Sequence, residues 1–580
     1  MSTSHLAITS PFTIPFRVAK SAHKSLLTVA VALGSLALLP KTGAVVPPPD
    51  GGYPGGNTAE GQSALFSLTT GGFNTAVGLF SIRSNATGNF NTGVGAGTLL
   101  LNTADSITAT GAAALLNNTT GTVNTADGAF ALFNNTTGNN NNAFGYQALF
   151  SNTTGPFNSA FGDGALESNT TGDRNTAIGE GALLGNTVGF QNIGIGVSAL
   201  RNNSTGHDNI AIGQDACSQS SGGQFNTALG SDALMFNSGS YNTAIGASAL
   251  DINTADSNTA VGEAAMLENT TGGTPGGSGT SEVGPNTALG TAALFSNTTG
   301  GANAAMGYEA LASNQAGDSI TAVGFKALLN STATFPNDAL GYKALVSNTT
   351  GSNNTAIGFA ALYNNSTGID NVAVGEFAGS NQTTGFDNVY IGEGIFGVAG
   401  ESNACYIKSI FGQTSVGGVP VLINSDNKLG TATSSKRFKD DIKPMGRASE
   451  VLLALKPVTF RYNKKIDPEG MPQFGLIAEE AEKVDPNLVV RDKEGKPYSV
   501  RYDQVNAMLL NEFLKEHKTV EEQRSTIATL KSTVTKQQKR FQSELAEQQS
   551  EIDALQSGLQ KVRTQLELSR PIPQMAVSDP

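Results

Sequence analysis

Apolar positions recur with a 17-residue period through most of the chain. The repeating unit reads approximately NTAxGxxALxxNTTGxx, as in residues 175–191. Twenty variants of it follow one another, most at steps of 17 residues, three at 16 and one at 28. They begin at residues 57, 74, 91, 107, 124, 141, 158, 175, 192, 209, 226, 242, 258, 286, 303, 320, 337, 354, 371 and 388. Self-similarity at a fixed period indicates a repeat architecture.

A 17-residue unit is too short for a helical hairpin, which needs about 34 residues. It suits one coil of a β-solenoid with two short strands and two corners. We expect a strand at each NTAIG-like segment and a corner at each NTTG, because Asn and Gly tolerate positive φ. Asn and Thr side chains are expected to stack and bond from coil to coil. At ~4.8 Å per coil, such an array makes a rod of roughly 95 Å.

One 17-residue coil encloses little interior, since each strand offers an Ala and one aliphatic side chain. We therefore expect chains to associate, so that the second face of the strand packs against a neighbouring chain. A single-chain solenoid is the alternative. The 28-residue step contains GGTPGGSG near Thr274, which predicts a loop extruded from one coil.

The pattern changes after residue 433. RASEVLLALKP, from Arg447, predicts a short helix that Pro457 stops, and a strand follows from Val458. FGLIAEEAEKVDP predicts a strand at Phe474 that turns into a helix ending near Pro486. Strands are expected at 488–492 and 498–503, and a long helix near Asp503, a suitable N-cap residue.

The long helix carries a heptad pattern over about 515–570. Apolar residues alternate at steps of three and four, with Gln548 filling one position of the same seam. This spacing predicts a coiled coil. The seam consists of Phe541, Leu545, Ile552, Leu555, Leu559, Val562 and Leu566, and Val520, Ile527 and Val534 extend it upstream.

Composition divides the chain at the same place. Residues 434–580 hold 24 Lys/Arg and 22 Asp/Glu, whereas residues 1–433 hold 11 and 25. The first part also contains 64 of the 69 Gly. The net charge of −12 therefore comes from the repeat side. An acidic balance argues against a nucleic-acid partner, whose binding site would be a basic patch.

The N-terminus has the pattern of a secretory signal peptide. Residues 1–24 contain Arg17, Lys20 and Lys24 but no acid, an apolar run covers 25–40, and small residues end at Ala44. The run is short for a membrane span, which needs about 20 apolar residues. We expect a secreted or cell-surface protein, with membrane attachment only if the segment is retained. Two isolated cysteines, Cys217 and Cys405, suit a fold that does not depend on disulfides.

The repeats offer little catalytic chemistry. Acids stand singly, as at Asp163, Glu180 and Asp215, and His207 is alone, so no cofactor or metal site is expected. The repeats over about 57–392 resemble the head repeats of trimeric autotransporter adhesins, which form left-handed β-rolls of three chains. The resemblance leaves the ligand open, and a glycan or cell-surface ligand is one candidate. A carboxylate pair assembled across chains would make a glycan-cleaving spike the minor alternative.

Three motifs over about 434–520 resemble the peptidase S74 family, the intramolecular chaperone of phage endosialidases and tail spikes. They are SSKRFKDDI from Ser434, FGLIAEEAEKVDPNLVV from Phe474, and VRYDQVNAMLLNEFLKEH from Val500. The resemblance implies a module that trimerises, helps the preceding fibre fold and then cuts itself off. It also implies a Ser-Lys dyad and a cut just before the motif's Ser.

Carried onto this chain, the resemblance makes Ser434 the nucleophile, Lys439 the general base and Thr433–Ser434 the scissile bond. Ser435 stands where the family usually has Asp, which leaves a second candidate nucleophile one position away. A lysine acts as a base only when burial or cationic neighbours lower its pKa, and Lys436 and Arg437 are near in the chain. The alternatives are a basic solvated face and a chaperone without cleavage.

We therefore predict a mainly β chain, a secreted or surface homotrimeric fibre with a self-cleaving serine endopeptidase that acts once on its own chain. A non-cleaved structural or adhesive fibre is the alternative. The predicted divisions are a signal peptide 1–44, a linker 45–56, β-solenoid repeats 57–392, a β neck 393–433, an S74-like chaperone domain 434–514, a coiled coil 515–570 and a tail 571–580.

Overall fold

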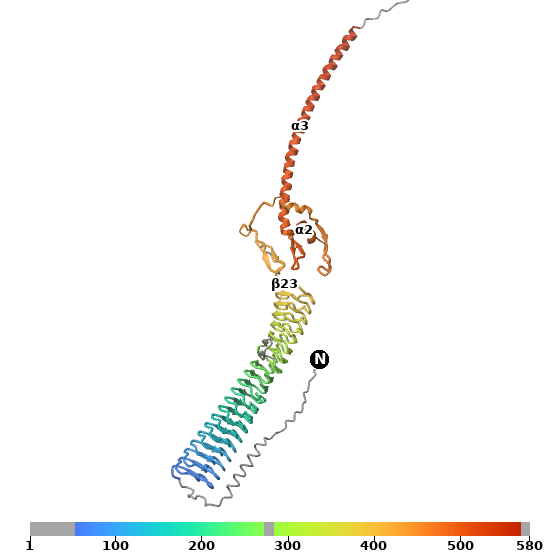
Figure 1. The fold of residues 1–580 in the computed structure, drawn as a ribbon. Helices are drawn as coiled ribbons and strands as arrows, with labels where there is room; N and C mark the ends of the chain where they lie inside the picture. The colour runs from blue at the N-terminus through green and yellow to red at the C-terminus, as the bar shows by residue number, and fades with distance from the viewer. Residues whose placement is uncertain (1–52, 272–283, 414, 570–580) are drawn as a thin grey trace, which may run out of the picture. The chain divides into compact units, whose positions relative to one another are not determined.

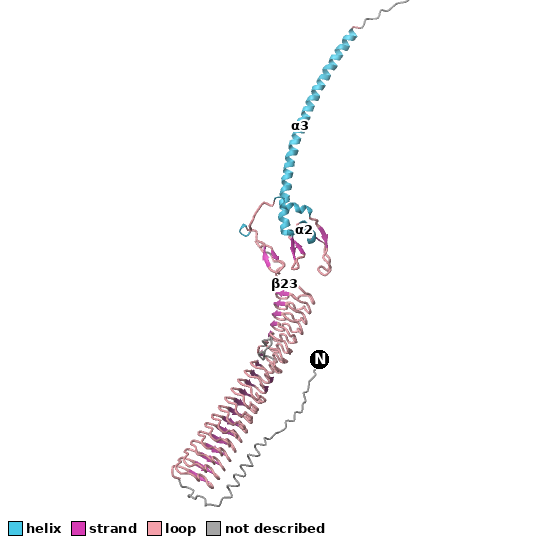
Figure 2. Ribbon diagram, viewed as in Figure 1, coloured by secondary structure: helices cyan, strands magenta, loops and turns pink. Residues whose placement is uncertain are grey.

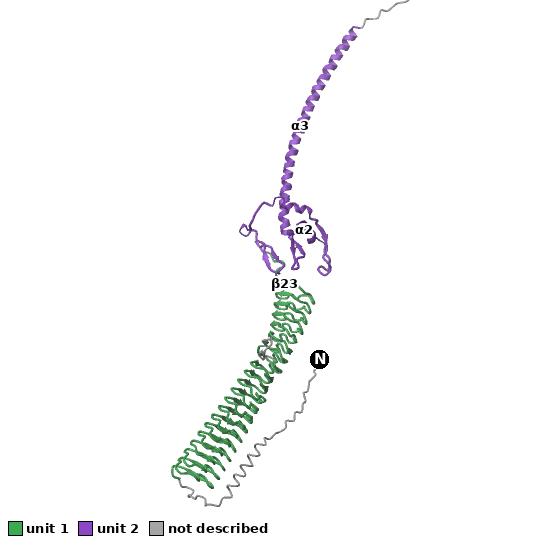
Figure 3. Cartoon of the chain, in the orientation of Figure 1, with its two compact units in different colours: residues 1–413 green, residues 414–580 purple. Residues whose placement is uncertain are grey.

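The computed structural model describes residues 53–271, 284–413 and 415–569. The predicted signal peptide and the C-terminal tail lie outside these residues. The chain forms two compact units, residues 1–413 and 414–580, shown in different colours in Figure 3.

The first unit is a β-solenoid in which each coil contributes one short strand to a 21-stranded parallel sheet (Figure 1). Nearly all strands have three residues. They are β1 (Thr58–Glu60), β2 (Thr75–Val77), β3 (Thr92–Val94), β4 (Thr108–Thr110), β5 (Thr125–Asp127), β6 (Asn142–Phe144), β7 (Ser159–Phe161), β8 (Thr176–Ile178), β9 (Ile193–Ile195), β10 (Ile210–Ile212), β11 (Thr227–Leu229), β13 (Thr243–Ile245), β15 (Thr259–Val261), β16 (Thr287–Leu289), β17 (Ala304–Met306), β18 (Thr321–Val323), β19 (Asp338–Leu340), β20 (Thr355–Ile357), β21 (Val372–Val374), β22 (Val389–Ile391) and β23 (Cys405–Ile407).

The register of the sheet follows the sequence repeat. Thr176 pairs with Ile193, 17 residues on, and every strand lies in register with the equivalent strand of the next coil. The ladder also continues across the 28-residue step, where Thr259 pairs with Thr287. The predicted strand at each NTAIG-like segment and the solenoid fold are confirmed, and the ladder extends past residue 392 to Ile407.

The prediction of two strands per coil is wrong for most coils. A second strand occurs only as the pair β12 (Phe236–Asn237) and β14 (Ile252–Asn253) among the described residues. Elsewhere the ALxx side of the coil is a series of tight turns, coloured as loop in Figure 2. Leucines there take left-handed backbone angles, such as φ 52° at Leu183 and 53° at Leu200. Positive φ bends the chain inward and is incompatible with an extended strand.

Small side chains make a thin core inside a single chain. In the coil that begins at Asn175, Ala177 points inward from the strand while Ala182 and Leu183 close the other side, and all three are fully buried. The same three positions are buried in nearly every coil and form one continuous cluster. A single chain therefore buries its own narrow interior. The expected association of chains must rest on the outer surface of the rod.

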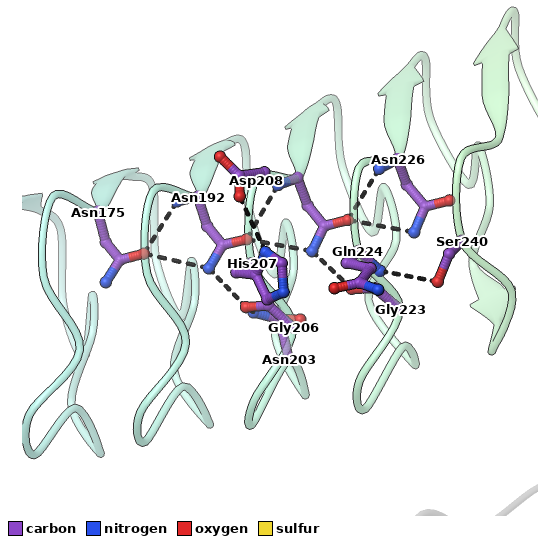
Figure 4. A network of polar contacts seen from close by, with 11 residues as sticks. Asn175, Asn192, Asn203, Gly206, His207, Asp208, Gly223, Gln224, Asn226 and Ser240 are labelled. Atoms are coloured by element: carbon purple, nitrogen blue, oxygen red, sulfur yellow. Dashed lines mark hydrogen bonds and ion pairs between the residues drawn. The ribbon is translucent and has the colours of Figure 1, made fainter.

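Two buried columns of asparagine run along the rod, interrupted by Ile107 and Ile320 in the first and by Ser220 and Ser331 in the second. In the first, the Asn192 backbone N–H and side-chain amide both donate to Oδ1 of Asn175, at 3.0 and 3.1 Å (Figure 4). In the second, Asn186 Nδ2 donates to Asn169 Oδ1 at 2.8 Å and to the Gly189 carbonyl at 3.0 Å. These amides thus satisfy buried groups of their own coil and of the neighbouring coil, as the predicted ladders require.

Asn186→Ala is expected to lower the free energy of unfolding of the full chain by about 1–3 kcal/mol. The change removes the donor to Asn169 Oδ1 and the acceptor of the Asn203 amide, both fully buried. Denaturant unfolding followed by circular dichroism measures it. The matched control is Asn202→Ala, whose exposed amide binds only Gln219 across the coils. Equal effects of the two changes would contradict the assigned role of the ladder.

The second unit contains three antiparallel hairpins, short helices and one long helix. The hairpins are β24 (Val421–Ile423) with β25 (Leu429–Thr431), β26 (Val458–Phe460) with β27 (Gln473–Gly475), and β28 (Val489–Arg491) with β29 (Pro497–Val500). The helices are η1 (Lys436–Phe438), η2 (Gly446–Ala454), α2 (Ala478–Val484), η3 (Pro486–Leu488) and α3 (Tyr502–Leu568). The elements predicted after residue 447 are present, although η2 is a 3₁₀ helix.

A small apolar core fastens the start of α3 to the rest of the unit. Val505 and Met508 on α3 pack with Ala481 on α2, Leu488 and Val489. The helix begins at Tyr502 and its N-cap is Arg501, so the prediction of Asp503 as the N-cap is wrong by two residues. Asp503 instead lies in the first turn, where a carboxylate interacts favourably with the free amide groups. The seam residues from Phe541 onward are exposed in the single chain.

Candidate functional site

The predicted scissile bond follows the β24–β25 hairpin. β25 ends at Thr431, two residues before Thr433, and the 3₁₀ turn η1 begins at Lys436. Both strands of the hairpin are exposed along their whole length. The bond therefore lies in an accessible segment that connects the β24–β25 hairpin to η1. That placement suits a peptide bond that must be reached and cut.

The turn η1 brings Ser434 and Lys439 together. The Phe438 N–H donates to the Ser435 carbonyl at 3.0 Å, and the Lys439 N–H donates to the Lys436 carbonyl at 3.2 Å. This turn folds the chain back, so that Lys439 Nζ donates to Ser434 Oγ at 3.1 Å. The hydroxyl in contact with the lysine is that of Ser434, while the Ser435 side chain makes no cap bond to η1.

The surroundings of this pair are polar and open. Residues 431–448 are exposed in the single chain, including both members of the pair. The Arg437 guanidinium lies 4.6 Å from the centroid of the Phe438 ring, a cation–π contact beside the pair. A single chain therefore supplies the geometry of the pair and nearby positive charge, but no burial.

A polar network that the sequence analysis missed joins α3 to η2. The Ser449 hydroxyl is fully buried, donates to Glu512 and accepts from Asn511, and Lys515 Nζ lies 3.4 Å away. Lys515 also donates to Glu512 at 2.7 Å. The hydrogen bonds from Lys515 and Ser449 lower the pKa of the Glu512 carboxyl below its usual range. The local signal was the Glu512–Lys515 pair at i,i+3, but its buried partner lies far away in sequence.

His207 of the rod lies beside a carboxylate and an aromatic ring. His207 Nδ1 lies 2.8 Å from the Asp208 carboxylate (Figure 4). The His207 ring stacks on Phe190 with centroids 4.6 Å apart. Cys217 and Cys405 are both free thiols. Burial raises the pKa of the Cys217 thiol to about 12, so it is unreactive at neutral pH.

Two carboxyls of the rod are perturbed. Burial, followed by the charge of Asp232, raises the pKa of Asp251 to about 6. Burial and Asp163 also raise the pKa of Glu167. In the part of the chain that the structure describes, no group of His, Cys, Asp and Glu is arranged to hold a metal ion. No helix among the described residues has both the length and the apolarity that a bilayer crossing requires.

The outer face of the sheet carries a continuous apolar row. In each strand the middle residue points inward, so the first and third residues point out. From β6 to β23, the third residue of each three-residue strand is apolar. Most of these side chains are more than a third exposed. We call these residues the outer row: Phe144, Phe161, Ile178, Ile195, Ile212, Leu229, Ile245, Val261, Leu289, Met306, Val323, Leu340, Ile357, Val374, Ile391 and Ile407.

A long β-solenoid followed by a small module of hairpins and short helices defines a modular, mainly β repeat protein. Within it, residues 434–490 match the model of the Peptidase S74 family, described as a chaperone of endosialidase. The match begins at Ser434 and includes Lys439. No curated protein and no solved structure matches the chain. The resemblance is thus confirmed over residues 434–490, which hold the first two of the three motifs.

Proposed function

We propose that this chain is a secreted or surface homotrimeric fibre whose C-terminal module gathers three chains, guides their folding and then cuts the Thr433–Ser434 bond. The observation that carries the proposal is the 3.1 Å hydrogen bond between Lys439 and Ser434, at the first residue of the segment that matches the S74 family. The solenoid is the substrate of the chaperone, and the cut removes the chaperone once the fibre is built.

Two exposed apolar surfaces support assembly from copies of the same chain. One is the outer row of the rod, and the other is the α3 seam, in which Leu545, Leu555 and Leu559 are each more than 60% exposed. Contiguous apolar surfaces of this extent mark interaction sites. The helices bring three chains together, and association of the rods then becomes effectively intramolecular. This reduces the cost of aligning a long array whose coils are nearly alike.

The chemistry of the cut follows from the position of the nucleophile. Neutral Lys439 removes the Ser434 hydroxyl proton as Oγ attacks the carbonyl carbon of Thr433. The carbon–nitrogen bond breaks, the Ser434 nitrogen takes up the proton from Lys439, and the Thr433 acyl group becomes an ester on Oγ. Water then hydrolyses the ester to the Thr433 carboxylate and free Ser434.

Assembly provides what the single chain lacks. A lysine loses its proton near neutral pH only when it is desolvated or faces other positive charges. Ser434 and Lys439 are both exposed in one chain. We therefore expect neighbouring chains to cover the pair, so that cleavage follows trimerisation and does not precede it. Loss of the module afterwards leaves the fibre kinetically trapped, because it cannot unfold along its assembly path.

The full chain is expected to be a trimer in solution, and Ile552→Asp with Leu555→Asp is expected to abolish both the trimer and the cut. The two carboxylates replace seam side chains and repel one another between helices. Light scattering gives the mass, and a denaturing gel reports the cut. Ser550→Asp with Ser557→Asp adds the same charge off the seam and should change neither. A monomeric mass for the unmutated chain would refute the assembly role.

One outcome favours the alternative of a fibre without cleavage. A trimer that stays uncut would leave a non-cleaved structural fibre with an active chaperone.

Mild oxidation supplies a further readout of assembly. Cys405 is a free, exposed thiol at the first position of β23, on the outward face beside the outer row. Contact between rods through this face would link copies through Cys405, whereas buried Cys217 would stay reduced.

A further inference from the structure

The repeat pattern is broken at one place near the end of the rod. In the 21-stranded sheet, the inward position holds Ala or Gly in every strand up to β21, but Tyr390 in β22 and Tyr406 in β23. A second departure lies nearby at Gly379. The equivalent residue of the preceding coil is Leu362, which is fully buried. A large side chain has thus moved from the turn side of the coil to the strand side.

The two exchanges complement each other in space. A Cβ added to Gly379 would lie 2.7 Å from Cδ2 of the Tyr390 ring and 2.9 Å from Leu362. Gly397 is equally close, since a Cβ there would lie 2.7 Å from Cε1 of Tyr390. Tyr390 is fully buried, so its ring occupies the space that a Leu at 379 would fill. Tyr406 stacks on it at 5.8 Å between centroids, with the rings nearly parallel at 7°.

The asparagine columns end in the two coils that contain Gly379 and Tyr390. Gln382 replaces the Asn of the second column, and its Nε2 donates to the Glu401 carbonyl at 2.7 Å. The last Asn of the first column, Asn388, donates to the same carbonyl at 2.8 Å. The Tyr406 hydroxyl donates to the Glu401 carboxylate at 2.9 Å, which raises the pKa of Tyr406. Glu401 thus accepts hydrogen bonds from the last residue of each column, through its carbonyl, and from Tyr406, through its carboxylate.

We infer that Tyr390, Tyr406 and Glu401 form a C-terminal cap that closes the rod and keeps its last coils folded without residues 434–580. Stacked repeats need a terminal unit that satisfies the groups a further repeat would have covered. All the residues of this cap lie in the first unit and before Thr433. The inference extends the proposed function, because only a rod that closes its own end survives release of the chaperone.

Hydrogen exchange of the full chain and of its Ser434→Ala variant tests the cap. The amides of β21, β22 and β23 are expected to be equally protected in the released fibre and in the uncleaved variant. Tyr390→Ala is expected to speed their exchange roughly 100-fold, as loss of a buried aromatic ring does, and to leave β2 to β9 unchanged. Tyr342→Ala is the control, since that ring is 41% exposed on the rod surface.

A pair of changes at the compensating positions makes the test stricter. Gly379→Leu alone should clash with Tyr390, whereas Gly379→Leu with Tyr390→Ala restores the arrangement of the other coils and should recover most of the protection. Loss of protection in wild type on release of residues 434–580 would assign the capping role to the module and overturn the inference. If the chain is not cleaved at all, the proposed function fails, but the Tyr390→Ala comparison still decides the cap.

Discussion

Ser434→Ala is expected to leave the chain as one full-length band on a denaturing gel, where the unmutated chain gives two fragments. The methyl group cannot attack the Thr433 carbonyl, so no ester forms and the bond stays intact. Because uncatalysed peptide hydrolysis is extremely slow, the expected effect is complete loss of the smaller band. N-terminal sequencing of that band in the unmutated protein should begin at Ser434.

The neighbouring residues provide the controls. Ser435→Ala removes a hydroxyl one position away without touching the 3.1 Å contact. This variant should still be cut. Lys439→Arg should not be, because a guanidinium keeps its charge and cannot accept the proton. Cleavage of Ser434→Ala together with loss of cleavage in Ser435→Ala would move the nucleophile to Ser435.

Much of the rod could be predicted because its repeat fixes local and tertiary structure together. An Asn before each strand and a Gly after it recur at a nearly constant step. The residue type at each position of the repeat therefore predicts the strand, the corner and the ladder between coils. The turn side was predicted wrongly. A second strand was expected in each coil, whereas Leu183 on that side has φ 52°, a left-handed backbone angle that an extended strand does not adopt.

The site divides in the same way. The Ser434–Lys439 pair lies within six residues, so a motif could identify it and one 3₁₀ turn could bring it together. The Ser449 network joins residues more than 60 positions apart. No periodic pattern in the sequence predicts a contact between residues so far apart. The tyrosine cap was missed for another reason. Gly379 and Tyr390 each depart from the repeat, but only the structure shows that the Tyr390 ring fills the space that a side chain at position 379 would occupy.

The glycine that ends each strand is the most demanding position of the repeat. Gly196 has φ 131°, and its equivalents in neighbouring coils have φ 134° and 140°. This region of backbone angles is accessible essentially only to glycine. A Cβ on Gly196 would lie 2.4 Å from the carbonyl oxygen of Gly213 and 2.6 Å from its carbon. The atoms in the way are backbone, and they cannot move without shifting the next coil.

Gly196→Ala is therefore expected to destabilise the rod by on the order of 3 kcal/mol or more, since backbone strain adds to steric overlap. Thermal unfolding of the full chain measures the loss. Gly181→Ala is the matched control: its φ is 63°, and the nearest heavy atoms to an added Cβ are 3.7 Å away. Because repeats interact mainly with their neighbours, the damage should centre on the coils around residues 192–213. Limited proteolysis should cut there and spare distant coils. Equal stability of the two variants would mean that neighbouring coils are not in contact along this column, and the parallel register of the sheet would then be wrong.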